Sequence, residues 1–176
     1  DSVGLVTFSN QINHYIPPRG KVTHLKAITD LLSSVPFGDD TSFEPVLSGL
    51  AERIRRRGLV IIISDFIDDP EVVLRGIRHL RHLRHDLILF QILDPDELEL
   101  PFKGLVRFRD PESRAELLTD PGRLMDEYRK RIAEFLRKYH DGAMEIGIDH
   151  LVLSTADPLD HALAGYLANR RRLQQG

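Results

Sequence analysis

The chain has 176 residues, of which 41% are hydrophobic and 29% charged, so it is long enough for a single domain over residues 1–176 with a buried core. Its formal net charge of −3 argues against a dedicated nucleic-acid-binding protein, because such proteins usually carry a basic excess. The sequence has no cysteine, which excludes disulfide scaffolds, thiolate zinc sites and cysteine nucleophiles.

The segment that ends at Gly58 predicts two strands followed by two helices. Val3–Phe8 has the composition of a buried strand, and residues 12–16 alternate like an edge strand that the next two prolines end. Apolar residues at helical spacing predict a helix over 22–34. The sequence Thr-Ser-Phe-Glu that begins at Thr41 fits a capping box and predicts the start of the second helix.

The rest of the chain alternates between strands and helices. An unbroken aliphatic run, Leu59–Ile63, predicts a central parallel strand that is covered on both faces. The elements expected after it are a helix from Pro70, a strand over 87–93, a loop over 95–101, a hairpin over 105–118, an amphipathic helix from 124, a strand over 150–154 and a helix after Pro158. This alternation indicates an α/β fold with a mostly parallel sheet.

The strongest candidate for chemistry is Asp65, which comes directly after the aliphatic strand. Ligands of open α/β sheets bind at the carboxyl ends of the strands, so the Asp65 carboxylate is predicted to face such a crevice. Asp68 follows three residues later and is a candidate binding residue. A purely structural interpretation stays open, in which Asp68 or Asp69 only caps the next helix.

A second polar segment approaches the same crevice from the other side. Asp39, Asp40 and Thr41 lead into the helix that precedes the Asp65 strand. Carboxylate and hydroxyl oxygens are the ligands that magnesium prefers, so Thr41 and Asp65 are predicted metal ligands and Asp39 and Asp40 predicted binding residues. In the alternative interpretation, Thr41 is only a helix cap.

Basic residues gather in the helix that follows Pro70. His79, His82 and His85 recur every three residues, and each directly follows an arginine, at 78, 81 and 84. This pattern predicts a solvated basic face that could bind an acidic partner. The arginines at 53–57 are interpreted as a solvated helix end, and without aromatic residues they do not resemble a platform for single-stranded nucleic acid.

Enzyme motifs are missing from the sequence, which contains no nucleophile elbow, no phosphate-binding Gly-rich loop and no dinucleotide fingerprint. We therefore predict a protein that is not an enzyme and has no catalytic residue. The alternative is a metal-dependent, phosphatase-like hydrolase with Asp65 as nucleophile. That alternative needs a lysine and a second acidic motif that converge on Asp65.

Four segments of the sequence are similar to the bacterial family called domain of unknown function 58, which itself resembles the von Willebrand factor A-like superfamily. They are VGLVTFSNQINHYIPP, GDDTSFEPVLSGLAERIRRRGLVIIISDFID, ILDPDELELPF and DHLVLSTADPLDHAL. The resemblance implies a Rossmann-like von Willebrand factor A-type domain, with a mostly parallel sheet and helices on both faces.

The resemblance also implies a metal-ion-dependent adhesion site. In the superfamily this site combines an Asp-x-Ser-x-Ser motif after the first strand, a threonine and an aspartate, and Thr41 and Asp65 match the second and third parts. No Asp-x-Ser-x-Ser occurs in this chain, and the family would place it upstream of Asp1, on a first central strand that is missing here. We therefore expect an N-terminally incomplete domain with a partial site, which would bind Mg²⁺ poorly unless the full-length protein supplies the other ligands.

The function implied by the resemblance is protein interaction. Relatives tend to accompany MoxR-type AAA+ ATPases, so such an ATPase is the expected partner, in chaperone or assembly work. Recognition would be metal-dependent, with a partner's carboxylate on the open position of the cation. The longest aliphatic run, Leu59–Ile63, is far shorter than the roughly 20 apolar residues that span a bilayer, so we expect no membrane segment and a cytoplasmic domain.

Overall fold

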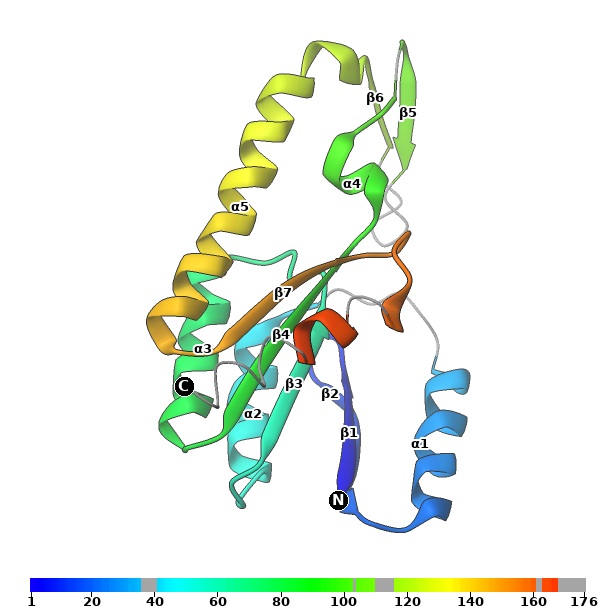
Figure 1. Ribbon diagram of the computed structural model, residues 1–176. Helices are drawn as coiled ribbons and strands as arrows, with labels where there is room; N and C mark the ends of the chain where they lie inside the picture. Colours follow the sequence, from blue (N-terminus) through cyan, green and yellow to red (C-terminus); the bar gives the residue numbers. More distant parts are fainter. Residues whose placement is uncertain (36–40, 103, 110–115, 161–162, 168–176) are drawn as a thin grey trace.

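The computed structural model describes residues 1–35, 41–102, 104–109, 116–160 and 163–167, and Figure 1 shows their arrangement. Its elements are β1 (Val3–Phe8), β2 (Ile12–Arg19), α1 (Val22–Ser34), α2 (Phe43–Arg53), β3 (Leu59–Ser64), α3 (Pro70–His82), β4 (Asp86–Leu93), α4 (Pro95–Glu99), β5 (Val106–Arg109), β6 (Glu116–Thr119), the 3₁₀ turn Pro121–Arg123, α5 (Met125–Ile146) and β7 (Asp149–Ser154). Residues 159–160 and 163–167 are also helical. No described helix is long and apolar enough to cross a membrane.

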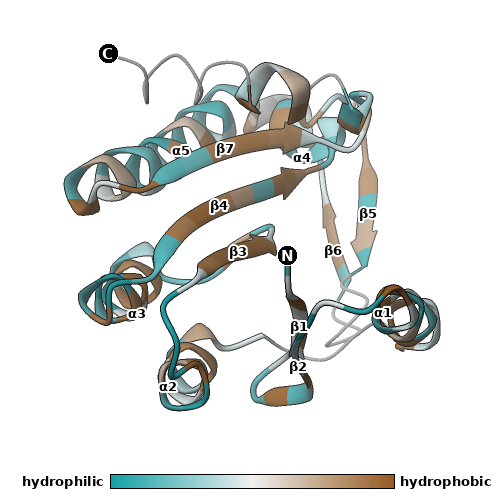
Figure 2. Cartoon of the chain, turned by 60° about the horizontal axis from the view of Figure 1, so that its bottom comes forward, coloured by the Kyte–Doolittle hydropathy of each residue, from teal (hydrophilic) through white to brown (hydrophobic). Residues whose placement is uncertain are grey.

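The centre of the fold is a parallel sheet of three strands in the order β3-β4-β7. Strand β4 pairs on both edges and is buried along most of its length. This confirms the predicted α/β class and the parallel sheet. Helices α2, α3 and α5 lie on one side of the sheet, and the helical segment 163–167 packs on the other side against Phe90 (Figure 2).

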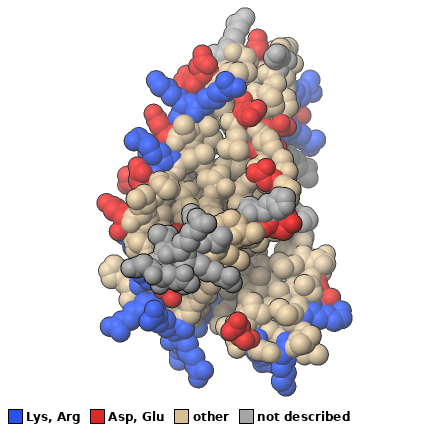
Figure 3. Space-filling view, viewed as in Figure 1, with Lys and Arg blue, Asp and Glu red and all other residues tan. Residues whose placement is uncertain are grey.

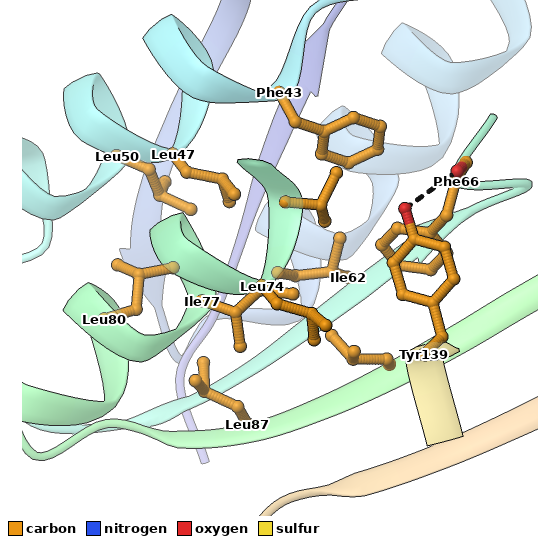
Figure 4. Packing of buried hydrophobic residues seen from close by; sticks show 12 residues of the cluster. Phe43, Leu47, Leu50, Ile62, Phe66, Leu74, Ile77, Leu80, Leu87 and Tyr139 are labelled. Atoms are coloured by element: carbon orange, nitrogen blue, oxygen red, sulfur yellow. Dashed lines mark hydrogen bonds between the residues drawn. The ribbon is translucent and has the colours of Figure 1, made fainter. Parts of the chain in front are cut away.

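The main core lies between the sheet and helices α2, α3 and α5 (Figure 4). Two glycines allow these helices to approach closely. A Cβ atom on Gly76 of α3 would lie 2.5 Å from Leu47 of α2, and one on Gly142 of α5 would lie 2.3 Å from Leu74 of α3. Both distances are far below van der Waals contact, so the close packing of these helices depends on glycine at each position.

The amino-terminal segment forms a separate antiparallel hairpin of β1 and β2. The described strands β1 and β3 share no ladder hydrogen bonds. Helix α1 follows the hairpin and stands apart from the other helices in Figure 2, with Val22, Leu25 and Leu32 at 83%, 51% and 50% exposure. Its contact with β1 includes a hydrogen bond of 3.0 Å between His24 Nε2 and the Val3 carbonyl.

Four expectations from the sequence need correction. Strand β1 is not buried, since each of its residues is partly or largely exposed. Strand β2 continues through both prolines to Arg19, which is tolerated because prolines fit an edge strand. Strand β3 is not covered on both faces, since Leu59, Ile61 and Ile63 are 53%, 46% and 60% exposed. The expected loop over 95–101 contains helix α4, which starts with a capping box at Asp94.

A second small hairpin lies beyond the sheet. Strands β5 and β6 pair antiparallel, as expected from the sequence, and residues 110–115 between them lie outside the described part of the chain. The hairpin and helix α4 are near the amino-terminal end of α5 (Figure 1). The predicted long helix is confirmed as α5, and the predicted last strand as β7.

Candidate functional site

The loop that follows β3 is held in an unusual backbone conformation. Phe66 has a φ of 57°, a left-handed conformation that an aromatic residue rarely adopts. Its side chain is fully buried, and its ring lies 5.4 Å from both the Phe43 and the Tyr139 rings, measured between centroids. The buried ring therefore fixes the loop that carries Asp65, as Figure 4 shows for Phe43, Phe66 and Tyr139.

Two buried polar side chains fix the backbone carbonyls of this loop. Tyr139 Oη donates a hydrogen bond of 2.9 Å to the Phe66 carbonyl (Figure 4). Gln91 Nε2 donates one of 2.9 Å to the Asp65 carbonyl, and Gln91 Oε1 lies 3.0 Å from His150 Nε2. Buried carbonyls need such partners, so β4, α5 and β7 together position the loop.

The buried groups of this network stay uncharged near neutral pH. Burial lowers the pKa of His150 to about 4, and nearby His140 contributes to the shift. Burial also raises the pKa of Tyr139, and the carboxylates of Asp68, Asp69 and Asp65 add to that rise. Neutral His150 and Tyr139 side chains hold the loop through hydrogen bonds and not through ion pairs.

The Asp65 side chain is exposed at the carboxyl end of β3. Its Oδ1 accepts hydrogen bonds of 3.2 Å from the Ile67 amide and from Ser64 Oγ. This local turn is typical of aspartate. The loop therefore presents a carboxylate in a fixed position at the edge where α/β sheets bind ligands.

Asp68 connects this loop to the start of helix α2. Its Oδ2 accepts a hydrogen bond of 3.2 Å from the Phe43 amide, and its Oδ1 accepts one of 2.6 Å from the Asp69 amide. Asp69 in turn caps α3 by accepting a hydrogen bond of 2.9 Å from the Glu71 amide. A carboxylate at a helix start also interacts favourably with the helix dipole, so Asp68 and Asp69 both stabilise helix starts.

The capping box predicted at Thr41 is wrong. The N-cap residue of α2 is Ser42, and its side chain accepts no hydrogen bond from the first amides of the helix. The acceptor comes instead from Asp68, 25 residues later in the sequence. Thr41 is exposed and precedes the N-cap residue Ser42, so its hydroxyl does not cap the helix.

The structure brings together the two segments that carry the predicted metal ligands. The Phe43 amide contacts Asp68, and the Ser42 amide donates a hydrogen bond of 3.3 Å to the Ser9 carbonyl. A direct approach of Thr41 to Asp65 stays a prediction. Asp39 and Asp40 lie outside the described residues.

No group of three or more acidic or histidine side chains within the described ranges could hold a metal ion. Thr41 and Asp65 provide two oxygen donors, fewer than magnesium requires from protein, water and substrate together. The donor chemistry suits magnesium, and the described residues alone do not form a complete site for it. The sequence analysis missed Tyr139, His150 and Gln91 as supporting residues, and the signal that could have found Gln91 is its place as the one polar residue within an apolar strand.

One comparison with known proteins gives a family, and a second gives relatives without a known function. Residues 1–141 match the family described as protein of unknown function DUF58. The uncharacterized protein Rv1480 of Mycobacterium tuberculosis and Mb1516 of Mycobacterium bovis are each 30% identical over 152 residues, which is 85% of this chain and 47% of either relative. The chain thus spans about half the length of these curated relatives.

Two solved structures share the fold. One is an aerotolerance-related membrane protein from Bacteroides fragilis, with a TM-score of 0.54, 13% identity and coverage of 88% of this chain and 73% of that chain. The other is the conserved hypothetical protein BatB from Bacteroides thetaiotaomicron, with a TM-score of 0.54, 12% identity and coverage of 98% and 80%. At this identity they support the architecture alone, whereas the match over residues 1–141 defines the relationship: the chain belongs to the DUF58 family of proteins of unknown function.

Proposed function

We propose that the chain is part of a non-enzymatic, von Willebrand factor A-type domain that binds a protein partner through a divalent cation. The observation that carries this proposal is the exposed Asp65 carboxylate on a loop fixed by Phe66, Gln91 and Tyr139. A rigid carboxylate at the carboxyl end of a parallel strand is suited to hold a cation. The partner's carboxylate would complete the coordination of that cation.

The environment of Asp65 favours binding over catalysis. The titratable groups that support its loop, Tyr139 and His150, have pKa values shifted away from neutrality. A general acid or base works best with a pKa near the operating pH. We therefore infer that these groups keep the loop in place, and no observation favours the hydrolase alternative.

The proposal includes one further strand between β1 and β3. Neither strand pairs with the other, and each has an edge without a ladder partner among the described strands. The exposed side chains of β3 and α1 would gain a neighbour from such a strand. A central parallel strand there would give the sheet order of a von Willebrand factor A-type domain, and an Asp-x-Ser-x-Ser motif at its carboxyl end would lie near Thr41 and Asp65.

Magnesium, a MoxR-type AAA+ ATPase and a cytoplasmic setting complete the proposal. Magnesium is supported by the oxygen donors Thr41 and Asp65. The ATPase is supported by the resemblance of the sequence to its family, and the setting stays an expectation from the lack of a long apolar run in the sequence. The domain would then assist the ATPase in chaperone or assembly work.

The test measures binding of the full-length protein to the ATPase by biolayer interferometry, in Mg²⁺ and in EDTA. We expect Asp65→Ala to weaken the Mg²⁺-dependent binding by at least about tenfold, because loss of a charged ligand removes several kcal/mol of coordination energy. Asp141→Ala on α5 removes another exposed carboxylate and should leave binding unchanged. Binding that is equal in Mg²⁺ and EDTA, or equally weakened by both variants, would contradict the proposal.

A further inference from the structure

Two arginine-rich segments form one surface at the amino end of the parallel sheet. Four arginines end or follow α2, and two lie at the end of α3 and in the turn after it; we call this set the basic end, which consists of Arg53, Arg55, Arg56, Arg57, Arg81 and Arg84. Blue atoms gather over the ends of α2 and α3 at the lower left of Figure 3. The surface lies at the opposite end of β3 from Asp65.

A single carboxylate links the two segments. Asp86 Oδ2 lies 3.6 Å from Arg57 Nη2, and Asp86 Oδ1 lies 3.3 Å from Arg81 Nη1. The Asp86 amide also donates a hydrogen bond of 3.0 Å to the Gly58 carbonyl. The geometry therefore shows that the basic end accommodates a carboxylate between arginines from different elements.

Most of the positive charge at the basic end is not neutralised. Arg55, Arg56 and Arg84 are exposed and form no ion pair with a carboxylate in the part of the chain that the structure describes. The surface is thus strongly positive on a chain with a net charge of −3. Such an asymmetry attracts and orients a negatively charged partner.

Arg84 adds a second observation. Its φ is 66°, a left-handed conformation that favours glycine or asparagine over arginine. The backbone therefore gives no reason for an arginine at this position. The exposed side chain extends the basic end, which suggests that its charge has a use outside the fold.

The residue types at the basic end indicate the chemistry of the partner. The segments 51–58 and 78–86 contain arginine and no lysine, and they contain no phenylalanine, tyrosine or tryptophan. The guanidinium group pairs with carboxylates through two parallel hydrogen bonds. Binding of single-stranded nucleic acid uses aromatic stacking, and membrane surfaces are usually anchored by aromatic or bulky apolar residues, so these features fit carboxylates better than bases or lipids.

We propose that the basic end binds a segment rich in aspartate and glutamate on a partner protein. The sequence suggested a basic face of α3 alone, with His85 as part of it. The structure changes that surface, because α3 ends at His82 and His85 is only 1% exposed. The arginines after α2 take its place, and the resulting contact is independent of the metal-dependent contact proposed at Asp65.

The test uses fluorescence anisotropy with labelled decaglutamate as the probe. We expect the double variant Arg55→Glu/Arg56→Glu to weaken binding by at least about tenfold, since it reverses two exposed charges, and added salt to weaken binding of the wild type. The matched control Arg129→Glu/Lys130→Glu makes the same charge change on α5 and should alter the affinity less than about twofold. Circular dichroism verifies that both variants fold.

Three further measurements distinguish carboxylate recognition at the basic end from a general attraction of negative charge. Arg55→Lys/Arg56→Lys keeps the charge and loses the planar fork, so we expect intermediate affinity. Asp65→Ala should leave decaglutamate binding unchanged, which distinguishes this surface from the site of the proposed function. Equal loss in the two Glu double variants, or tighter binding to phosphatidylglycerol vesicles or oligothymidylate than to decaglutamate, would overturn the proposal.

Discussion

Strand β4 of the parallel sheet and the amino-terminal segment differ in how completely they bury their apolar side chains. Strand β4 buries six of its eight residues. In the first 35 residues, by contrast, only Ser9 and Ile28 are buried, although α1 is amphipathic. An amphipathic pattern therefore identifies the apolar face of an element, but it does not ensure that another element covers that face.

The hairpin is attached to the rest of the fold at its turn. The Phe8 ring lies 5.5 Å from the Phe43 ring, measured between centroids. The Ser42 amide donates a hydrogen bond to the Ser9 carbonyl. Val6 and Ile12 are partly buried against the main core. The hairpin turn is therefore anchored, while α1 is expected to open at a lower free energy than β4.

The largest expected difference comes from the same truncation in both regions. Leu89→Ala in β4 removes a side chain that is fully buried, and we expect the free energy of unfolding to fall by about 2–5 kcal/mol. Leu25→Ala in α1 removes a side chain that is half exposed and should change it by less than about 1 kcal/mol. Urea denaturation of the two variants tests this, and equal losses would remove the distinction between the regions.

The next largest effect is expected from a single hydroxyl group. Tyr139→Phe leaves the buried Phe66 carbonyl without its donor, which should lower the free energy of unfolding by about 1–3 kcal/mol. Tyr15→Phe removes a hydroxyl from the exposed strand β2 and should cost less than about 0.5 kcal/mol. The measurement is again urea denaturation. If Tyr139→Phe proved neutral, the hydrogen bond would not contribute to holding the Asp65 loop.

A pH dependence is expected from His150 in the region of the sheet. Its pKa is lowered by burial, and secondarily by His140, from 6.5 to about 4, so the unfolded chain binds more protons between these values. Stability should therefore fall as pH decreases from about 6.5 to 4. Because the ring is only partly shielded from water, we expect this residue to contribute about 1–2 kcal/mol of the fall.

The variant His150→Gln isolates that contribution. Glutamine does not titrate and can still donate to Gln91 Oε1, the partner of His150 Nε2. The loss of stability between pH 6.5 and 4 should be smaller in the variant than in the wild type, as measured by urea denaturation at several pH values. Identical pH profiles would show that His150 does not couple folding to protonation.

Elements whose type and burial follow from their own residues could be predicted from the sequence. The segment 87–93 was predicted as a buried strand from its apolar composition, and α3 and α5 followed from helical spacing. The prediction that β3 is covered on both faces was wrong. An aliphatic run indicates a strand, but it does not show whether another element packs on each face of that strand. Local pattern therefore identified the strand and missed its environment.

The candidate site, too, could be predicted only in part from the sequence. Asp65 could be placed at a strand end because it follows the strand directly in sequence. The residues that hold its loop in place could not be predicted, because Tyr139 is 73 residues from Phe66 and their contact depends on the tertiary fold. The cap of α2 was missed for the same reason, since the Phe43 amide donates to the carboxylate of Asp68 and not to the hydroxyl of Thr41.

The smallest effect on stability is expected at the exposed side of β3. Ile61 is 46% exposed, so Ile61→Lys should change the free energy of unfolding of this chain by less than about 1 kcal/mol. It should nevertheless reduce self-association, because charges on an exposed strand disfavour edge-to-edge pairing. Light scattering measures the association, and Leu117→Lys, which places the same charge on exposed β6, is the control that should have little effect.

The same substitution tests whether a further strand covers β3 in the full-length protein. If that strand pairs with the free edge of β3 and its crossover helix covers the exposed face, Ile61 loses its exposure there, and Ile61→Lys should destabilise the full-length protein by about 2 kcal/mol or more, because a charge would be buried without a partner. Thermal unfolding of both lengths, each with and without the substitution, gives this comparison. Equal and small effects in both proteins would mean that the exposed face of β3 stays uncovered, which would contradict a von Willebrand factor A-type domain with helices on both faces of its sheet.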